Sequence, residues 1–180
     1  MRRNLAIFVL TCCLGMTTQV HAQLMSVKTN ALMDLLTVPN IDLSITTSNS
    51  TAVSASVFGS QKVLGNKVEM WGVKPEFRYW LSGRTHTGYF VGLSVVGVSY
   101  DITWKKEVHR GDAFGGGVVL GYDVYLSKHW TLDLHGGFGG IYYHQQSYSD
   151  GDKILEKNFN EKGILTVPYD VGVSVVYIFR

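Results

Sequence analysis

The segment LTVPYDVGVSVVYIF, from Leu165 to Phe179, decides the fold because apolar and polar residues alternate along nearly all of it. Successive side chains of a β-strand point to opposite faces, so the pattern predicts one long strand with an apolar face and a mostly polar face. Such a strand is typical of a transmembrane β-barrel, with lipid outside and polar side chains inside. The expected apolar face consists of Leu165, Val167, Tyr169, Val171, Val173, Val175, Tyr177 and Phe179, and the expected polar face of Thr166, Asp170, Gly172 and Ser174.

The first 22 residues are expected to form an export signal. Arg2 and Arg3 give a basic start, an apolar run extends from Leu5 to Leu14, and Val20-His21-Ala22 provides a small-residue cleavage site. The apolar run is too short to cross a bilayer as a helix. We therefore assign residues 1–22 to a signal peptide for the Sec pathway and residues 23–180 to one domain.

Removal of this signal changes both the charge and the cysteine content. Of the 16 basic residues, Arg2 and Arg3 lie in the signal, which leaves 14 basic residues beside 14 acidic ones. A net charge of zero gives no support for nucleic-acid binding. Cys12 and Cys13 are also removed, which excludes thiolate catalysis and cysteine metal sites in the mature chain. A lipoprotein signal is the weaker alternative, because Thr11 precedes Cys12 where a small Gly or Ala is expected.

Eight strand-like stretches follow the signal, and no stretch shows helical periodicity or a continuous apolar span of helical length. They cover residues 25–36, 40–47, 51–59, 67–81, 88–103, 112–127, 129–144 and 164–179. Strands without helices predict an all-β fold. Their even number favours an eight-stranded antiparallel up-and-down transmembrane β-barrel in the outer membrane. With both termini in the periplasm, the longer and more charged connections at 60–66, 104–111 and 145–163 would face outside.

Aromatic residues gather near both ends of the predicted strands. Indole and phenol rings prefer the headgroup layer of a membrane, so this distribution predicts two aromatic girdles. The core of a soluble sandwich, which is the alternative, would place aromatic residues in the middle of strands. The residues assigned to the girdles are Trp71, Tyr79, Trp80, Trp104, Phe114, Trp130, Tyr142, Tyr177 and Phe179.

The polar face of the predicted strands carries a set of ionisable residues. An eight-stranded barrel is filled by its own side chains, so these residues predict a packed interior without a pore. Buried charges need partners, which favours an internal network of ion pairs. A proton relay or metal site is the alternative, but no His-x-His or Glu-x-x-His spacing supports it, and we expect no cofactor. The set comprises Lys28, Asp34, Asp42, Lys74, Glu76, Arg78, Asp123, Asp133, His135 and Asp170.

Two of the connections are candidate outer contact loops. The connection at 104–111 is basic and suited to bind lipopolysaccharide phosphates. The connection at 145–163 mixes charges with apolar residues that a purely solvated loop does not need. Their candidate contact residues are Lys105, Lys106, His109, Arg110, Ile154, Leu155 and Phe159. An enzyme would need a nucleophile, a base and an acid at the outer rim, and the sequence offers His144, Ser147 and Asp150.

Short motifs along the mature chain resemble an uncharacterised domain-of-unknown-function family of short outer-membrane proteins from Bacteroidetes-type bacteria. The resemblance rests on Lys28-Thr29-Asn30, Pro39-Asn40, Phe77-Arg78-Tyr79-Trp80, Phe90-Val91-Gly92, Tyr100-Asp101, Gly117, Gly121-Tyr122 and Pro168. It implies a small outer-membrane barrel, sometimes encoded beside fimbria genes, without catalytic residues to carry over. Arg180 departs from the aromatic residue with which such barrels usually end.

Together these features predict a small non-conducting barrel with a structural or adhesive role. Its expected partners are outer-membrane lipid, lipopolysaccharide and fimbrial or other surface proteins. Two alternatives stay open, a lipid A-modifying outer-membrane enzyme and a soluble periplasmic barrel that holds a lipid.

Overall fold

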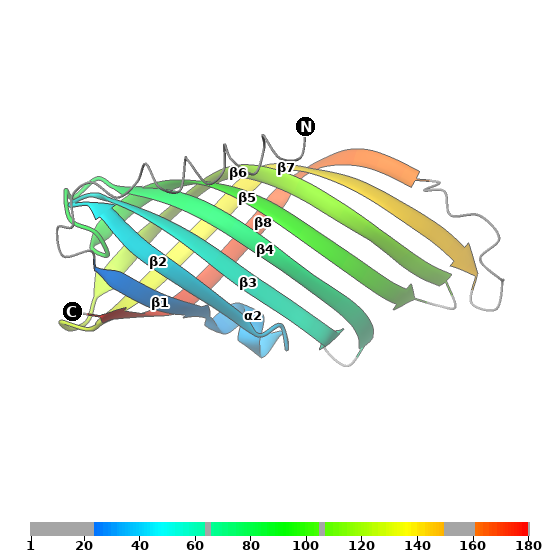
Figure 1. Cartoon of the computed structure of the whole chain (residues 1–180), viewed down its shortest axis with the longest axis horizontal. Helices are drawn as coiled ribbons and strands as arrows, with labels where there is room; N and C mark the ends of the chain where they lie inside the picture. Colours follow the sequence, from blue (N-terminus) through cyan, green and yellow to red (C-terminus); the bar gives the residue numbers. More distant parts are fainter. Residues whose placement is uncertain (1–23, 64–65, 105–106, 150–160, 180) are drawn as a thin grey trace, which may run out of the picture.

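The chain forms a closed antiparallel barrel of eight strands, which confirms the predicted all-β class (Figure 1). The computed structural model describes residues 24–63, 66–104, 107–149 and 161–179. Each strand pairs with its neighbours in sequence, and β8 closes the barrel against β1. The elements are β1 (Met25–Asn30), α2 (Ala31–Leu35), β2 (Asn40–Ser48), β3 (Thr51–Val63), β4 (Asn66–Trp80), β5 (Gly88–Trp104), β6 (Glu107–Tyr125), β7 (Trp130–Ser149) and β8 (Glu161–Phe179). No helix in the described residues has the length and hydropathy needed to span a membrane.

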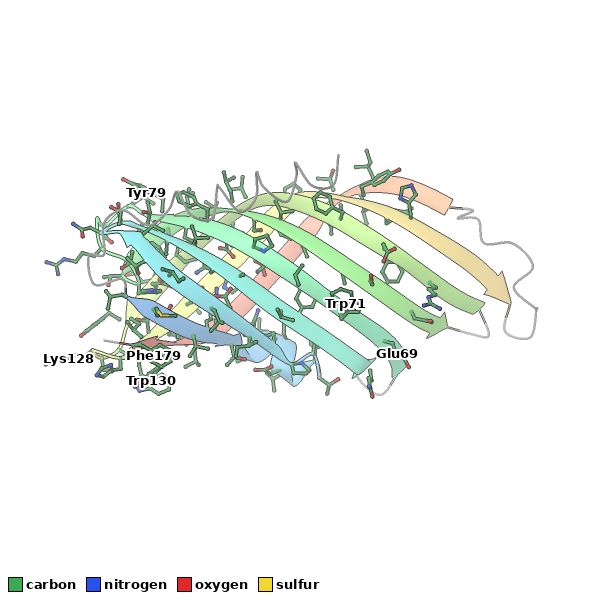
Figure 2. The ribbon with its side chains drawn as sticks, viewed as in Figure 1. Glu69, Trp71, Tyr79, Lys128, Trp130 and Phe179 are labelled. Atoms are coloured by element: carbon green, nitrogen blue, oxygen red, sulfur yellow. The ribbon has the colours of Figure 1, made fainter. Side chains whose placement is uncertain are left out.

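Alternation along the strands places apolar side chains outside and polar or small ones inside. On β2, Ile41, Leu43 and Ile45 are exposed, whereas Asp42 and Ser44 between them are buried. Directly paired residues of antiparallel strands share a face, so the same division continues around the barrel. Figure 2 shows Trp71, Tyr79 and other outward side chains surrounding the ribbon.

The two ends of the barrel differ. At the turn end, residues 49–50, 81–87 and 126–129 connect the strands; at the rim end, the connections are α2 with residues 36–39, and residues 64–65, 105–106 and 150–160. The prediction of longer connections at 60–66 and 104–111 is wrong, because pairing continues to Val63 with Asn66 and to Trp104 with Glu107. β4 to β8 consequently extend well beyond β1 and β2 at the rim end (Figure 1).

The first strand is shorter than predicted, since it ends at Asn30 and the one-turn helix α2 follows. Asn30 Oδ1 accepts hydrogen bonds from the backbone N–H groups of Leu32 and Met33, at 3.0 and 3.4 Å, as an N-cap does. The helix carries Asp34 to the exposed surface, where Thr29 and Asn40 donate to its carboxylate. The assignment of Asp34 to the barrel interior is therefore wrong.

The last strand contains a bulge that the sequence pattern does not reveal. Gly137 pairs with Asp170 and the next residue, Phe138, pairs with Pro168, so Tyr169 is an extra residue on β8. One inserted residue reverses the faces of the strand on its far side. Val171 to Phe179 keep the expected faces, but Tyr169 turns inward, and Val167 and Leu165 follow it inside. The predicted single apolar face from Leu165 to Phe179 is thus wrong for its first three members.

Candidate functional site

Among the described residues, charged side chains form one network of contacts across the barrel interior. Of the ionisable residues predicted to fill the barrel, all except Asp34 face the lumen, and each is buried or nearly so. They come from strands on opposite sides of the barrel, so their contacts cross the lumen. β1 contributes Lys28, β2 Asp42, β4 Lys74, Glu76 and Arg78, β6 Asp123, β7 Asp133 and His135, and β8 Asp170.

Arg78 is the centre of this network. Its Nη1–H donates to Asp133 Oδ2 across the lumen at 2.5 Å, and its Nε–H donates to Glu76 Oε1 at 2.5 Å. Glu76 and Arg78 are two residues apart on β4 and therefore share its inner face. The other carboxylate oxygen of Glu76 lies 3.7 Å from Lys74 Nζ, so the inner face of β4 alternates in charge.

The network closes on itself through β7 and β8. Lys74 Nζ donates to Asp170, whose Oδ1 lies 3.5 Å from His135 Nε2. His135 Nδ1 lies 2.8 Å from Asp133 Oδ1, which completes the circuit. Both ring nitrogens of His135 thus face carboxylate oxygens, an arrangement suited to the imidazolium form with two N–H donors.

We call this circuit the charge ring: Asp133, Arg78, Glu76, Lys74, Asp170 and His135. Acidic and basic side chains alternate around it, so each carboxylate has two partners. Buried charges are tolerated when they are paired and hydrogen-bonded. Every charged group of the ring lies within 3.7 Å of an opposite one, while Glu76 Oε2 and Arg78 Nη2 have no hydrogen-bond partner among the described residues. Its chemical effect is to hold strands β4, β7 and β8 in one register across the lumen.

Lys28 and Asp42 extend the charge ring toward the short strands. Lys28 Nζ on β1 lies 3.5 Å from Asp133 Oδ2 and 3.7 Å from Asp42 Oδ2. Ser54 on β3 donates its hydroxyl to Asp42 at 3.2 Å. Lys28 therefore joins β1 and β2 to the same network.

Asp123 is bound by a residue that sequence analysis placed on the outside. Trp80 Nε1–H donates to Asp123 Oδ2 at 2.8 Å, and the indole is 1% exposed. Its assignment to an aromatic girdle is wrong, because Trp80 has the same strand parity as the inward-facing Glu76 and Arg78. Trp80 packs against Phe90, and Arg78 lies over the Phe90 ring at 4.3 Å from its centroid.

The turn end of the lumen is closed by His86, which sequence analysis did not select. Its ring is buried 5.2 Å from that of Trp80, and Ser26 Oγ lies 3.4 Å from its Nε2. Thr131 donates its hydroxyl to the His86 carbonyl at 3.5 Å. Burial, together with the nearby cations Arg78 and Lys28, lowers the pKa of His86 to about 4. A neutral imidazole therefore closes this end of the barrel at neutral pH.

Little free space remains around these groups. The space between Ser26, Lys28, Arg78, Trp80 and His86 measures about 10 Å³, about the volume needed for one water molecule. A substrate has no room in that space. Within the same described residues, no group of three His, Cys, Asp or Glu is arranged to hold a metal ion.

Most aromatic residues assigned to the girdles lie on the outside of the barrel. Trp71 lies toward the rim end, and Tyr79, Trp130 and Phe179 lie toward the turn end (Figure 2). Phe114 is exposed on the rim-end half of β6, where it pairs with Tyr142. Tyr142 is also exposed, and its hydroxyl lies 2.8 Å from His144 Nε2. Tyr177 is half-buried between Trp130, His129 and Phe179. The side chain of Trp104 lies outside the described residues.

The candidate contact loops are only partly described. Lys105, Lys106, Ile154, Leu155 and Phe159 lie outside the described residues, as does Asp150 of the candidate catalytic trio. His109 and Arg110 belong to strand β6 and not to a loop, with Arg110 exposed and paired across from Asp101. Ser147 lies on β7, where it pairs with His109.

Residues 7–179 match the protein family described as "Protein of unknown function (DUF3575)". No curated protein and no solved structure matches the chain.

Proposed function

The chain belongs to the DUF3575 family, whose function is unknown, and we propose that it is a non-conducting outer-membrane β-barrel with a structural or adhesive role. One observation carries this proposal: the outside of the barrel is apolar between two levels of aromatic residues, while the charge ring crosses its inside. A soluble barrel would place its apolar side chains inside.

The outward residues of two strands follow the same order from rim end to turn end. On β4 the order is Glu69, Trp71, Val73, Pro75, Phe77 and Tyr79, and on β6 it is Asp112, Phe114, Gly116, Val118, Leu120 and Tyr122. Each thus has an acid, an aromatic ring, an apolar stretch and a tyrosine. Trp71 to Tyr79 covers about 27 Å of strand, or about 21 Å along the axis at a tilt of about 40°. The apolar band of outer-membrane barrels is about 25 Å tall.

The interior supports a role other than transport. The charge ring crosses the lumen from β4 to β7 and β8, and His86 with Trp80 closes the turn end. Opening a path for solutes would expose charged groups that are now paired with one another. The barrel is therefore suited to anchor a surface structure and not to conduct.

The rim end supplies the surface for contact. There the outward residues become polar, with Glu69, Asp112 and Arg110 exposed beyond the aromatic level. We place this end outside the cell, where its neighbours are lipopolysaccharide and fimbrial or other surface proteins. Export through the Sec pathway by way of residues 1–22 is part of the same proposal.

Fractionation and gel mobility test the membrane assignment. We expect the protein in the outer-membrane fraction, and we expect unboiled, detergent-solubilised protein to migrate differently from boiled protein on a denaturing gel. In planar bilayers the refolded barrel should give no steady conductance, with a porin as the positive control. Recovery as a soluble periplasmic protein without a mobility shift would refute the membrane barrel.

A loop deletion tests the adhesive role. Replacing residues 150–160 with a short Gly-Ser linker should retain the heat-dependent gel shift but reduce binding of whole cells to surface polymer or to fimbriated partner cells. The matched control replaces residues 126–129 at the turn end, which should leave cell binding unchanged. Equal binding by both variants would exclude the loop as the adhesive element.

A further inference from the structure

The lumen changes chemical character along its axis. Toward the rim end, beyond the charge ring, Val96 pairs with Gly115, Gly115 with Ile141, and Ile141 with Leu165. Paired residues share a face, and Val96 and Gly115 are buried, so this row lines the inside. The rows beside it add further apolar side chains. The apolar lining comprises Phe58, Met70, Val96, Val98, Ala113, Ile141, Leu165 and Val167.

Side chains that cross the lumen bound this apolar section on the side of the charge ring. The Tyr169 hydroxyl is hydrogen-bonded to Ser94 across the lumen, and Lys74 is paired with Asp170 beside it. The Tyr169 ring also packs against the buried cluster of Trp80, Phe90, Val119 and Ala52. The β8 bulge, which turns Tyr169 inward, therefore separates the apolar section from the charge ring.

The apolar section is incompletely enclosed on one side. β1 pairs with β8 only from Ser174 to Phe179, and β2 pairs with β3 only as far as Phe58. Beyond these points, among the described residues, α2 contacts β8, and the Leu36–Pro39 turn is hydrogen-bonded to Gly59 and Ser60 of β3. Asn30 Nδ2 donates to the Val171 carbonyl at 3.3 Å, just beyond the last β1–β8 pair. Backbone left unpaired at membrane depth is tolerated where it lines a cavity or is covered.

Two observations locate an entrance on this side. Leu165 is 53% exposed although it faces inward, whereas Val96 at the other end of the same row is 9% exposed. An open groove also lies at the β3 edge, lined by Thr37, Pro39, Gly59, Ser60, Gln61 and the lumen residue Met70.

We infer that the rim half of the lumen binds one hydrocarbon chain of a membrane lipid, which enters sideways over α2 between β3 and β8. The described lining above Lys74 carries no charge, which favours hydrocarbon over a polar ligand. Leu32 and Leu35 of α2, which contacts β8, are exposed, as is Ile164 on the outside of β8 beside Leu165. Barrels of eight strands are either filled by side chains or hold one small ligand, and here the charge ring would stop the chain below.

This inference rests on the proposed membrane location, which supplies the lipid, and palmitic acid is the probe that tests it. Protein without residues 1–22 is refolded from urea into detergent, mixed with palmitic acid, and examined by native mass spectrometry. We expect binding that saturates at one palmitate per barrel. Leu165→Trp, which fills the entrance from inside, should weaken that binding by about tenfold or more. Thr166→Trp, on the next and outward-facing position of β8, should leave it unchanged.

A second pair of variants is used if Leu165→Trp does not fold, as judged by the heat-dependent gel shift. Val96→Phe narrows the same row from β5, and Val95→Phe is its outward-facing control. No bound palmitate, binding without saturation, or equal loss in the inward and outward variants would overturn the inference. Failure of the membrane proposal gives a different result, namely a barrel that folds without detergent, and palmitate stoichiometry can still be measured on it.

Discussion

Arg78 on β4 and Asp133 on β7 meet across the lumen, with guanidinium Nη1 2.5 Å from carboxylate Oδ2. The two residues are 55 positions apart in sequence, so their contact forms only when the barrel closes. Asp133 also pairs with Lys28 on β1 and with His135 on its own strand, so one buried carboxylate connects three strands, β1, β4 and β7. The pair therefore has more effect on the closed state of the barrel than any surface ion pair.

Arg78→Ala should destabilise the barrel by about 3–5 kcal/mol, because it leaves the buried Asp133 and Glu76 carboxylates without their main partner. The measurement is urea unfolding of the refolded barrel in detergent or lipid vesicles. Arg84→Ala is the matched control, since Arg84 is exposed in the 81–87 turn, and it should change stability by less than about 0.5 kcal/mol. Equal midpoints for the two variants would show that the charge ring is not a stabilising element.

Trp80→Phe should cost about 1–3 kcal/mol, because Asp123 loses the indole N–H that donates to it inside the barrel. Trp71→Phe is the control, since Trp71 is exposed on the outside of the same strand. The two variants are compared by urea unfolding followed by tyrosine-region circular dichroism. A larger loss for Trp71→Phe would place Trp80 on the outside after all.

Acid should weaken the turn end through His86. Its pKa is about 4 in the folded protein and about 6.5 when unfolded, so the unfolded chain binds more protons between these values. Stability from this group is complete above pH 6.5 and is lost as the pH falls through 4, by about 3 kcal/mol at most. His86→Asn retains the positive φ of 59° that this position needs and removes the titration.

The test of this pH dependence compares unfolding free energies of the wild type and His86→Asn from pH 7 to pH 4. Other titrating groups contribute to both curves, so the difference between the curves reports His86. We expect the wild type to lose more stability than the variant over this interval. Parallel curves would mean that the His86 ring is solvated.

Gly139→Ala should reduce stability by about 1–3 kcal/mol through overpacking. A Cβ added to Gly139 would lie 2.2 Å from the backbone oxygen of Gly116 on the paired strand. Gly140→Ala is the neighbouring control, because a Cβ there meets nothing within 4 Å. Heat-dependent gel mobility and urea midpoints report both variants, and a tolerated Gly139→Ala would contradict the close β6–β7 approach.

The two-residue alternation of side chains along each strand is sufficient to predict which residues of most strands face the barrel interior. Lys74, Glu76 and Arg78 alternate with Val73, Phe77 and Tyr79, and the structure divides them between inside and outside accordingly. Trp80 is the exception, because its aromatic ring at a strand end favours a girdle, whereas the two-residue period of β4 places it inside with Arg78.

Other features depend on interactions that no local pattern carries. Asp34 has the right parity for the interior, but the Asn30 cap starts a helix before the strand reaches it. Tyr169 turns inward because of a bulge opposite Gly137 and Phe138, which is set by pairing between strands. His86 lies in a turn, where strand periodicity gives no direction, so its burial against Trp80 becomes visible only in three dimensions.

The most direct measurement of the central claim is a set of magnetisation-transfer contacts between lipid chains and methyl-labelled valines of the barrel in nanodiscs. Two adjacent pairs, Val118 with Val119 and Val175 with Val176, present one side chain outside and one inside. A membrane barrel with a closed interior predicts contacts from lipid chains to Val118 and Val175 and none to Val119 and Val176. Equal contacts within both pairs, or no lipid contact at Val118 and Val175, would contradict it.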